Sequence, residues 1–575
     1  MLEDEDSLTV LPTGGGKSLC FQLPALLKEG MAVVVSPLIS LMKDQVDNLK
    51  DMGVASCFLN SSQSAEQQAL AIEQIRKGEI KLLYVSPERL QGEATLNLLN
   101  SVRLSFFVID EAHCISHWGH DFRGNYRNLW MIKERFKSAS VHAFTATATK
   151  EVQQDVVEQL RLINPNIHIG QVDRPNLTYR VIPRKQILKQ IMDVLTKHAN
   201  EAGIIYCLRR KDVDNVSAEL KSQGIDNVGY HAGMSDKERH IAQERFAREK
   251  VNIVVATIAF GMGIDRSNIR FVIHAGMPKS IEHYQQETGR AGRDGLSASC
   301  YMFYGGGDYR LWSFFAEEAA DREVMMKKLS SIYNFCTQPQ CRHKVLMNYF
   351  GQDYEKCSCD ACDYCLNELD MVDDALSLGQ KILSCVVEVR QKYYGFGAGH
   401  VVNVLKGKLI EKIERMGHHN LSTFGAIQEE SEVFIRHMIE QLLGQGFLFK
   451  EGEFSTLSVT DTGKQLLRGE QSPILAKPLL VVKKKEAAKM TAERRKEEWK
   501  DVDPELFQKL REKRTELAQK KAVPAYIIFG DKTLRDIAAK KPMTKEAFSS
   551  IYGVGESKLE SYADIFIKVV SDYDR

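Results

Sequence analysis

Short runs rich in Val, Ile and Phe alternate with longer segments of helical periodicity between Leu8 and Tyr304. The clearest runs occupy residues 31–36, 81–86, 105–110, 141–146, 203–207, 252–257, 270–275 and 299–304. Apolar strands that alternate with helices are typical of parallel sheets covered by helices on both faces. The pattern therefore predicts an α/β fold for this part of the chain.

The alternation breaks once, at residues 171–183, which show no strong period and contain Pro175. The rhythm of strands and helices starts again after this interval. We therefore expect two parallel-sheet lobes, at residues 1–175 and 176–308, with a hinge near the break.

The strand runs end after Asp308, and the rest of the chain is mainly helical in pattern. Residues 309–370 read as helices that lead into a cluster of cysteines. Residues 371–469 read as amphipathic helices followed by two short alternating runs around Glu451-Gly452-Glu453, an order typical of a winged helix. Their apolar periodicity alone would fit any small helical bundle equally well.

The last two segments differ in composition. Residues 470–503 are rich in Lys and Arg and contain Pro473 and Pro478, so we interpret them as a basic linker. Residues 504–575 predict a small all-helical domain that is only mildly basic.

Composition narrows the class of protein. A length of 575 residues suggests about three to five domains. With 77 Lys and Arg against 76 Asp and Glu the chain is nearly neutral, so a nucleic-acid surface would need local basic clustering. The acidic first residues do not resemble a targeting signal, and no run approaches the ~18 apolar residues of a membrane span. We expect a protein that stays inside the cell and does not enter a membrane.

Half of the cysteines are clustered: six of the 12 lie between Cys336 and Cys365. In a reducing compartment such a cluster indicates metal rather than disulfides. Cys359, Cys362 and Cys365 follow one another at a spacing of three, Cys341 precedes them, and four thiolates suit tetrahedral Zn²⁺. By spacing alone, Cys336 and Cys357 remain alternative ligands.

A glycine-rich phosphate loop is predicted at residues 12–18, PTGGGKS, between an apolar run and a helical pattern. Consecutive glycines let backbone N–H groups curl around a polyphosphate at a helix N-terminus. Lys17 would offer a charge to the terminal phosphates, and the Ser18 hydroxyl could hold Mg²⁺.

Two further groups carry candidate chemistry. Asp110 and Glu111 end an apolar run, and carboxylates at this end of a parallel strand face the ligand crevice. Asp110 would hold the metal, and Glu111 would orient and deprotonate water. Arg290 and Arg293 stand three residues apart on one face of a helical turn, where an arginine could reach a γ-phosphate.

These motifs together resemble a superfamily 2 DNA helicase: PTGGGKS, DEAH at 110–113, FTATAT at 144–149, TIAFGMGID at 257–265 and QETGRAGRDG at 286–295. The aromatic-rich segment AHCISHWGHDFR at 112–123 narrows the resemblance to RecQ-family helicases. The resemblance covers essentially the whole chain. It implies two RecA-like lobes, a zinc-binding helical subdomain, a winged helix and a terminal HRDC-like domain that contains YIIF at 526–529.

The resemblance also assigns roles to residues. It implies that the catalytic residues are Lys17, Asp110, Glu111, Gln286, Arg290 and Arg293, with Arg293 as the finger. It implies that nucleotide and Mg²⁺ are bound by Thr13, Gly14, Gly15, Gly16, Lys17, Ser18 and Asp265. It implies that DNA contact and coupling involve Ser36, Pro37, Ser86, Arg89, His113, Trp118, Phe122 and Arg123. It selects Cys341, Cys359, Cys362 and Cys365 as the zinc ligands.

The implied activity is that of an ATP-dependent 3′ to 5′ DNA helicase acting on single-stranded and branched duplex DNA in recombination and repair. It implies ATP, Mg²⁺ and Zn²⁺ as cofactors, and single-strand-binding or repair proteins as partners. It implies a cytoplasmic location, at the nucleoid if the source is bacterial. A junction-binding scaffold with impaired ATP turnover is the alternative, and the zinc and winged-helix segments disfavour an RNA helicase.

One element of the resemblance is missing. In RecQ helicases an aromatic residue and a glutamine that recognise adenine precede the phosphate loop by some tens of residues, whereas here only residues 1–11 precede Pro12. We therefore expect weaker selectivity for adenine and an unpaired edge on the first sheet.

Overall fold

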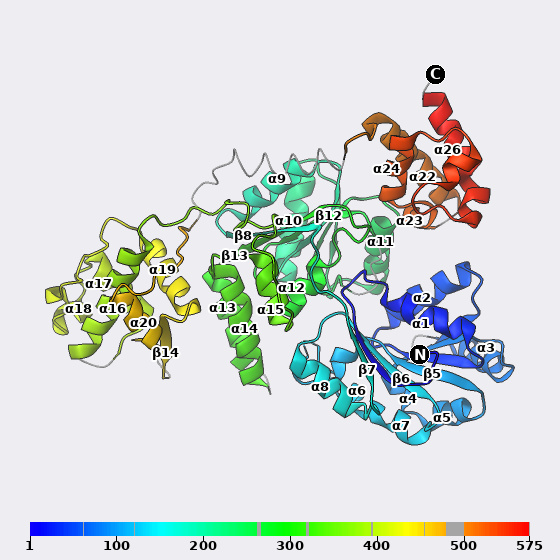
Figure 1. The fold of residues 1–575 in the computed structure, drawn as a ribbon, viewed down its shortest axis with the longest axis horizontal. Coiled ribbons are helices and arrows are strands. Elements are labelled where there is room, and N and C mark those ends of the chain that lie inside the picture. Colours follow the sequence, from blue (N-terminus) through cyan, green and yellow to red (C-terminus); the bar gives the residue numbers. More distant parts are fainter. Residues whose placement is uncertain are drawn as a thin grey trace.

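The computed structural model describes residues 1–60, 63–119, 121–261, 266–317, 321–392, 395–452, 455–478, 499–521 and 523–573. Two parallel sheets form the centre of the molecule, a helical domain with a small hairpin lies at one end, and a separate helical domain lies at the other (Figure 1). The predicted α/β fold with helical C-terminal domains is confirmed.

The first lobe is a seven-stranded parallel sheet with the strand order β3-β4-β2-β5-β6-β1-β7. Its strands are β1 (Ser7–Val10), β2 (Met31–Val35), β3 (Ser56–Leu59), β4 (Leu82–Val85), β5 (Leu104–Ile109), β6 (Ser140–Thr145) and β7 (Asn166–Ile169). Its longer helices are α1 (Lys17–Leu27), α2 (Ile39–Asp51), α3 (Ala65–Arg76), α5 (Glu93–Asn100) and α8 (Lys150–Gln159).

Both faces of this sheet are buried. Along β2, Val33 and Val35 belong to one apolar cluster, whereas Ala32 and Val34 belong to another on the opposite face. The strand is therefore apolar at every position, because successive side chains point to opposite faces and helices cover both. This explains why the run 31–36 is continuous rather than alternating.

The edge of the first sheet differs from our expectation. The missing segment predicts an unpaired edge on this sheet, but β7 pairs in parallel with β1 over four residues, so β7 and not β1 is the outer strand on this side. All four residues of β7 are exposed, so the strand has no apolar run by which the sequence could predict it.

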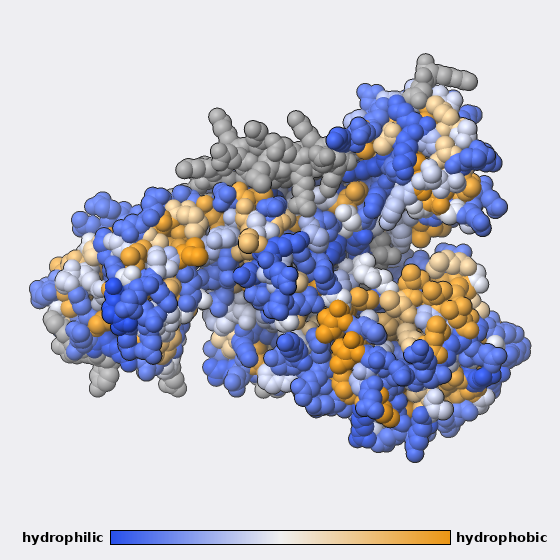
Figure 2. Space-filling view, viewed as in Figure 1, coloured by the Kyte–Doolittle hydropathy of each residue, from blue (hydrophilic) through white to orange (hydrophobic). Residues whose placement is uncertain are grey.

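Apolar side chains gather on the surface of this lobe over α1 and α2 (Figure 2), where Leu19, Leu23 and Leu27 of α1 are exposed.

The second lobe is a six-stranded parallel sheet with the order β10-β11-β9-β12-β13-β8. Its strands are β8 (Leu177–Pro183), β9 (Ala202–Tyr206), β10 (Asn227–Tyr230), β11 (Ile253–Ala256), β12 (Ile269–His274) and β13 (Ala298–Tyr304). Its helices are α9 (Ile187–Lys197), α10 (Arg210–Ser222), α11 (Asp236–Ala247) and α12 (Ile281–Thr288). The interval 171–183 is therefore only partly a hinge, because β8 fills its second half and pairs with β13.

A helical subdomain follows, with α13 (Gly306–Glu317), α14 (Arg322–Thr337) and α15 (Arg342–Tyr349) before the cysteine cluster. The winged-helix order is confirmed by α16 (Ala375–Lys392), α17 (Ala398–Lys406), α18 (Glu411–Arg415), α19 (Glu432–Gly444), the antiparallel hairpin β14 (Leu448–Glu451) and β15 (Thr456–Val459), and α20 (Asp461–Leu467). Phe447 is buried in this domain and Phe449 is 44% exposed on the hairpin, whereas Phe454 lies outside the described residues.

The terminal domain is all-helical as predicted, with α22 (Pro504–Lys520), α23 (Ala525–Ile528), α24 (Asp531–Lys540), α25 (Lys545–Ser549) and α26 (Glu556–Tyr573). It lies beside the second lobe (Figure 1). The fully buried Arg514 on α22 pairs with Asp531 of its own domain at 2.7 Å and with Glu249 of the second lobe at 3.0 Å. Because a charge removed from water needs a partner, this two-sided ion pair ties the two domains together.

None of the helices in the described ranges is long and apolar enough to cross a membrane.

Two buried histidines lie against each other in the core of the winged helix. His400 Nε2 lies 2.8 Å from Nδ1 of His418, both rings are buried, and Phe396 stacks on His400. Burial, together with His418 and Lys412, lowers the pKa of His400 to about 4. The ring is therefore neutral in the folded domain at neutral pH.

We predict that this domain loses stability as the pH falls from about 6.5 to 4. A histidine in the unfolded chain takes up its proton near pH 6.5, whereas folded His400 does so near pH 4. Because protonation therefore stabilises the unfolded state first, the free energy of unfolding falls by about 3 kcal/mol by pH 4. Hydrogen exchange of α17 at several pH values would measure the loss. His400→Gln should make its pH dependence shallower, and an unchanged slope in that variant would contradict the assignment.

Candidate nucleotide site and zinc centre

The phosphate loop connects β1 to α1, as predicted. Gly14 and Gly16 have φ angles of 82° and 84°, in the left-handed region that favours glycine. A Cβ on Gly15 would lie 2.9 Å from the carbonyl oxygen of Pro12, so the loop has no space for a side chain there. Helix α1 begins at Lys17 without a side-chain cap, which leaves its first N–H groups free to bind an anion.

Asp110 and Glu111 stand where β5 ends, close to the phosphate loop. Glu111 adopts a left-handed backbone with φ of 47°, which is strained for a non-glycine residue and is found mainly at functional sites. Its backbone N–H donates to Oδ1 of Asp110 at 3.0 Å. Burial and the Glu111 carboxylate raise the pKa of Asp110 to about 7, and Lys17 opposes this shift. Such a carboxyl pair favours a cation.

The orientation of Glu111 also fits a polar ligand. Its Oε2 is buried, has no hydrogen-bond partner among the described residues, and lies 3.4 Å from Nδ1 of His113. His113 is itself buried and its Nδ1 lies 2.9 Å from the hydroxyl of Thr145, the last residue of β6. His113 therefore connects the acidic pair to the neighbouring strand rather than pointing to solvent.

Of the two predicted arginines of the second lobe, Arg293 reaches the phosphate loop of the first, whereas Arg290 lies beside Tyr206 and Gly261 of its own lobe. A Cβ on Gly14 would lie 3.2 Å from Cγ of Arg293, so this side chain already packs against the loop. A Cβ on Gly289 would lie 3.1 Å from Cβ of Thr13. Arg290 is buried beside the Tyr206 hydroxyl, and Gln286 lies half-buried on α12. Asp265, predicted to bind the nucleotide, lies outside the described residues.

Sequence reasoning missed Arg174, which lies in the hinge between the lobes. Its guanidinium donates to the carbonyl oxygens of Thr13 at 3.1 Å, Ala291 at 3.1 Å and Gly292 at 2.8 Å. One side chain thus joins the phosphate loop to the turn that carries the two arginines. The sequence offered no signal for this role, because the acceptors are backbone carbonyls from distant segments.

The segments predicted to touch DNA come together beside the nucleotide site. The guanidinium of Arg123 donates to the carbonyl oxygen of Pro37 at 2.9 Å. Ser86 caps α4 (Pro87–Leu90), which contains Arg89 and packs against α6 (Gly124–Arg127). Ser36 is buried at the end of β2, so its side chain does not reach the surface.

The aromatic-rich loop, residues 112–123, leaves its large rings accessible. Trp118 is 47% exposed and Phe122 is 37% exposed. His117 stacks on Phe122 with ring centroids 3.9 Å apart. Because exposed aromatic faces are unfavourable in water and stack readily on bases, this arrangement suits single-stranded nucleic acid.

The predicted cysteines form a cluster. The sulfur atoms of Cys341, Cys359, Cys362 and Cys365 all lie within 4.8 Å of one another, as tetrahedral zinc requires. Cys336 is buried elsewhere, with its thiol 3.4 Å from the sulfur of Met302, and Cys357 is exposed. The structure therefore separates the four cysteines from the two alternatives that spacing had left open.

The cysteine cluster is attached to the second lobe at the edge strand β8. The N–H of Tyr179 donates to the carbonyl oxygen of Ala361 at 3.0 Å, and Tyr179 also forms a parallel bridge with Cys362. Oδ2 of Asp363 accepts from the N–H of Val181 at 2.9 Å. The cluster thus satisfies backbone groups that an edge strand would otherwise expose.

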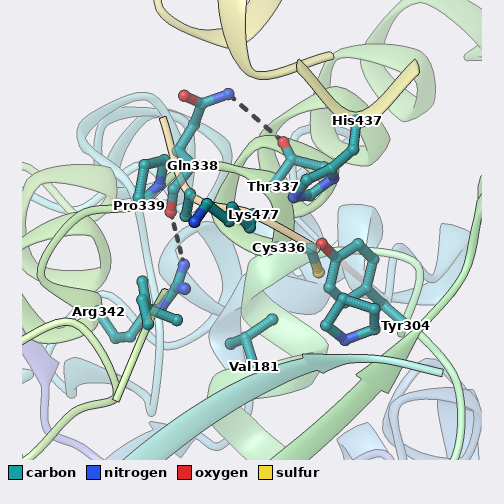
Figure 3. Close-up of a pocket in the computed structure, with 12 residues that line it drawn as sticks. Val181, Tyr304, Cys336, Thr337, Gln338, Pro339, Arg342, His437 and Lys477 are labelled. Atoms are coloured by element: carbon teal, nitrogen blue, oxygen red, sulfur yellow. Dashed lines mark hydrogen bonds between the residues drawn. The ribbon is translucent and has the colours of Figure 1, made fainter. Parts of the chain in front are cut away.

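A small crevice marks where this subdomain, β8 and the winged helix meet (Figure 3). Val181, Tyr304, Arg342 and His437 line it together with residues 336–339. Arg342 is buried there, pairs with both oxygens of Asp363 and donates to the carbonyl oxygen of Gln338 at 2.9 Å. The crevice is therefore a structural junction, distant from the phosphate loop in the sequence and lined by other residues.

Five families match the chain in sequence order. Residues 1–156 match the DEAD/DEAH box helicase family, 184–295 the helicase conserved C-terminal domain, 306–366 the RecQ zinc-binding domain, 370–484 the RQC domain and 503–570 the HRDC domain.

Named relatives match over nearly the whole chain. An ATP-dependent DNA helicase RecQ of Pasteurella multocida is 40% identical over all of this chain and 90% of its own length. The protein of the same name from Bacillus subtilis is 37% identical over 99% of this chain and 94% of its own length. A RecQ-like DNA helicase, blm-1, of Caenorhabditis elegans is 31% identical over all of this chain and 63% of its own length.

We predict that Cys362→Ser lowers bound zinc below one ion per chain and makes the edge strand β8 of the second lobe less stable. A structural zinc contributes about 10 to 16 kcal/mol of apparent binding free energy, and Cys362 also bridges to Tyr179 of β8. Elemental analysis measures the zinc, and hydrogen exchange of β8 measures the loosening. Cys357→Ser is the matched control and should retain the metal. Full zinc content in Cys362→Ser would remove this cysteine from the site.

Proposed function

The chain belongs to the RecQ family and is an ATP-dependent DNA helicase, and from that premise we propose how its residues perform the reaction. We propose that it moves in the 3′ to 5′ sense on single-stranded DNA and opens branched duplexes during recombination and repair. Its place of action is then the compartment that holds the DNA, with single-strand-binding or repair proteins as partners.

The observation that carries this proposal is the meeting of the two lobes at the phosphate loop. Arg293 packs against Gly14, and the Arg174 guanidinium joins Thr13 to the turn at Ala291 and Gly292. A nucleotide bound at this loop would lie between the lobes. Its hydrolysis would therefore change how the lobes hold each other, which is the movement a translocating enzyme needs.

The chain's own groups suit phosphoryl transfer. The N–H groups at the start of α1 and the Lys17 ammonium would bind the phosphates. Ser18 and Asp110 would hold Mg²⁺, which when bound neutralises charge on the phosphate oxygens. Glu111, with its buried oxygen, would orient the attacking water and accept its proton. Arg290 and Arg293 would stabilise the charge that develops on the γ-phosphate, with about 10³- to 10⁵-fold effect on rate.

The DNA strand is proposed to run past the exposed rings of Trp118 and Phe122. Each base that stacks on an aromatic ring gains about 1 to 3 kcal/mol. Arg123 connects these rings to Pro37, and His113 connects the same loop to Glu111. Movement of the DNA would therefore be sensed at the residue that orients water.

The winged helix is the proposed point at which the duplex is opened. Phe449 is exposed on the hairpin whereas Phe447 belongs to the core, so Phe449 is the described ring that is free to stack on an end of the duplex. The terminal helical domain, docked through Arg514, is proposed as an auxiliary surface for single-stranded DNA.

The test compares ATP hydrolysis by the full chain with and without single-stranded DNA, beside Lys17→Ala. The rate of hydrolysis should rise with DNA. Lys17→Ala should lower this rate by about 10² to 10³-fold, because the substitution removes the positive charge that would stabilise the phosphates. DNA affinity of the variant should stay close to that of the parent, because the proposed DNA contacts lie on other segments.

Two outcomes would contradict the proposal. Equal loss of DNA binding and hydrolysis in folded Lys17→Ala would contradict the proposed role of Lys17 in binding the phosphates. Absence of DNA-stimulated hydrolysis in the parent chain would favour the junction-binding scaffold. Unwinding of matched DNA and RNA forks, each with a 3′ or a 5′ tail, tests the polarity and the class of nucleic acid.

A further inference from the structure

A single lysine joins three parts of the molecule beside the nucleotide site. Lys328 lies on α14 of the zinc-binding subdomain, and its ammonium donates to the carbonyl oxygens of Trp118 at 2.6 Å and Gly119 at 2.8 Å. The same nitrogen lies 3.2 Å from Oε1 of Glu282 on α12. These three acceptors match the three donors of an ammonium group.

The lysine holds the backbone of the aromatic-rich loop while its rings stay accessible. Gly119 has no space for a side chain, because a Cβ there would lie 2.2 Å from the carbonyl oxygen of His113. The backbone of the loop is therefore closely packed at the two residues whose carbonyl oxygens accept from Lys328. The rings of Trp118 and Phe122 nonetheless remain open to solvent. A second contact, His117 Nδ1 to Oδ2 of Asp321 at 3.2 Å, ties the same loop to the start of α14.

The other partner of Lys328 leads directly to the arginines of the second lobe. Glu282 lies in the first turn of α12, and Gln286 lies one turn later on the same helix. Arg290 and Arg293 follow where that helix ends. Both Glu282 and Lys328 are largely buried, with side chains 4% and 15% exposed, so water competes weakly for their contact. One ammonium thus connects the loop to the helix that leads to Arg290 and Arg293.

We propose that Lys328 is a positioning residue that couples DNA binding to ATP hydrolysis. It holds the aromatic-rich loop in the conformation that DNA requires and links that loop to α12. The inference rests on the proposed function, since it assumes that this loop is the DNA sensor. Without Lys328, the loop would have to be ordered at the moment of DNA binding, at the expense of affinity.

The experiment compares Lys328→Met, Lys328→Arg and Lys327→Met with the parent full chain. Methionine keeps the length of the side chain and removes its charge. Arginine keeps the charge, and Lys327 is the exposed neighbour on the same helix. ATP hydrolysis is measured without DNA and over a range of oligothymidine concentrations. Hydrogen exchange of residues 116–119 and the thermal midpoint are measured without nucleotide or DNA.

Lys328→Met should keep the basal rate, require about tenfold more DNA for half-maximal stimulation, and exchange faster at residues 116–119. Lys328→Arg should recover most of the stimulation, and Lys327→Met should behave as the parent. Unchanged hydrogen exchange at residues 116–119 in Lys328→Met would overturn the inference, whether or not DNA stimulates hydrolysis by the parent chain. Parallel loss of basal rate and thermal midpoint would also overturn it, by showing a purely structural role. Lack of DNA stimulation in the parent would reject the proposed function instead.

Discussion

The proposed nucleotide site lies between two separately folded sheets, and among the contacts that join them Arg174 links the phosphate loop directly to the turn before Arg293 by hydrogen bonds. Its guanidinium, in the hinge, reaches the phosphate loop at Thr13 and the arginine-bearing turn at Ala291 and Gly292. The planar guanidinium carries donors on separate nitrogens, so one nitrogen reaches Thr13 while another reaches Ala291 and Gly292, a span that a compact ammonium does not cover. Because each lobe contributes only part of the chemistry, the geometry of this one contact decides whether the parts form a site.

The zinc-binding subdomain supports the same hinge from the other side. His343 on α15 lies 2.6 Å from the Asp173 carboxylate, next to Arg174 in the sequence. The side chain of Gln352 bonds to the backbone of Val172 and Gly170, and the cysteine cluster completes the edge of β8. The subdomain that carries the cysteine cluster thus supports the segment from which Arg174 reaches the phosphate loop. The ion pair of Arg514 with Glu249 extends this support to the terminal domain.

Much of this architecture could be predicted because it is encoded locally. The apolar runs became strands, the hairpin around Gly452 formed, and the terminal segment is helical. The strands that escaped prediction, such as β7 and β10, are four residues long and carry polar or exposed positions, so burial leaves no pattern in them. Strand β8 occupies the second half of the interval expected to be a hinge, and the sequence did not predict it because its partner β13 is distant in sequence.

The candidate site also has one part that the sequence predicts and another part that it does not. Lys17, Asp110, Glu111 and the four cysteines belong to motifs whose spacing carries their chemistry, and the structure places the acids near the phosphate loop and the thiols in one cluster. Arg174 and Lys328 were missed because both bind backbone carbonyls, and any sequence supplies those. Likewise, only packing could separate buried Phe447 from exposed Phe449. The roles of the individual site residues stay predictions.

The most direct test of this account is the maximal rate of ATP hydrolysis by Arg174→Lys at saturating single-stranded DNA. Lysine keeps the charge but cannot span Thr13 and Gly292 together, so Arg290 and Arg293 would lose their alignment with the phosphates. The account predicts a rate lower by about 10²-fold, with ATP affinity and thermal midpoint close to those of the parent. A maximal rate equal to that of the parent would contradict it.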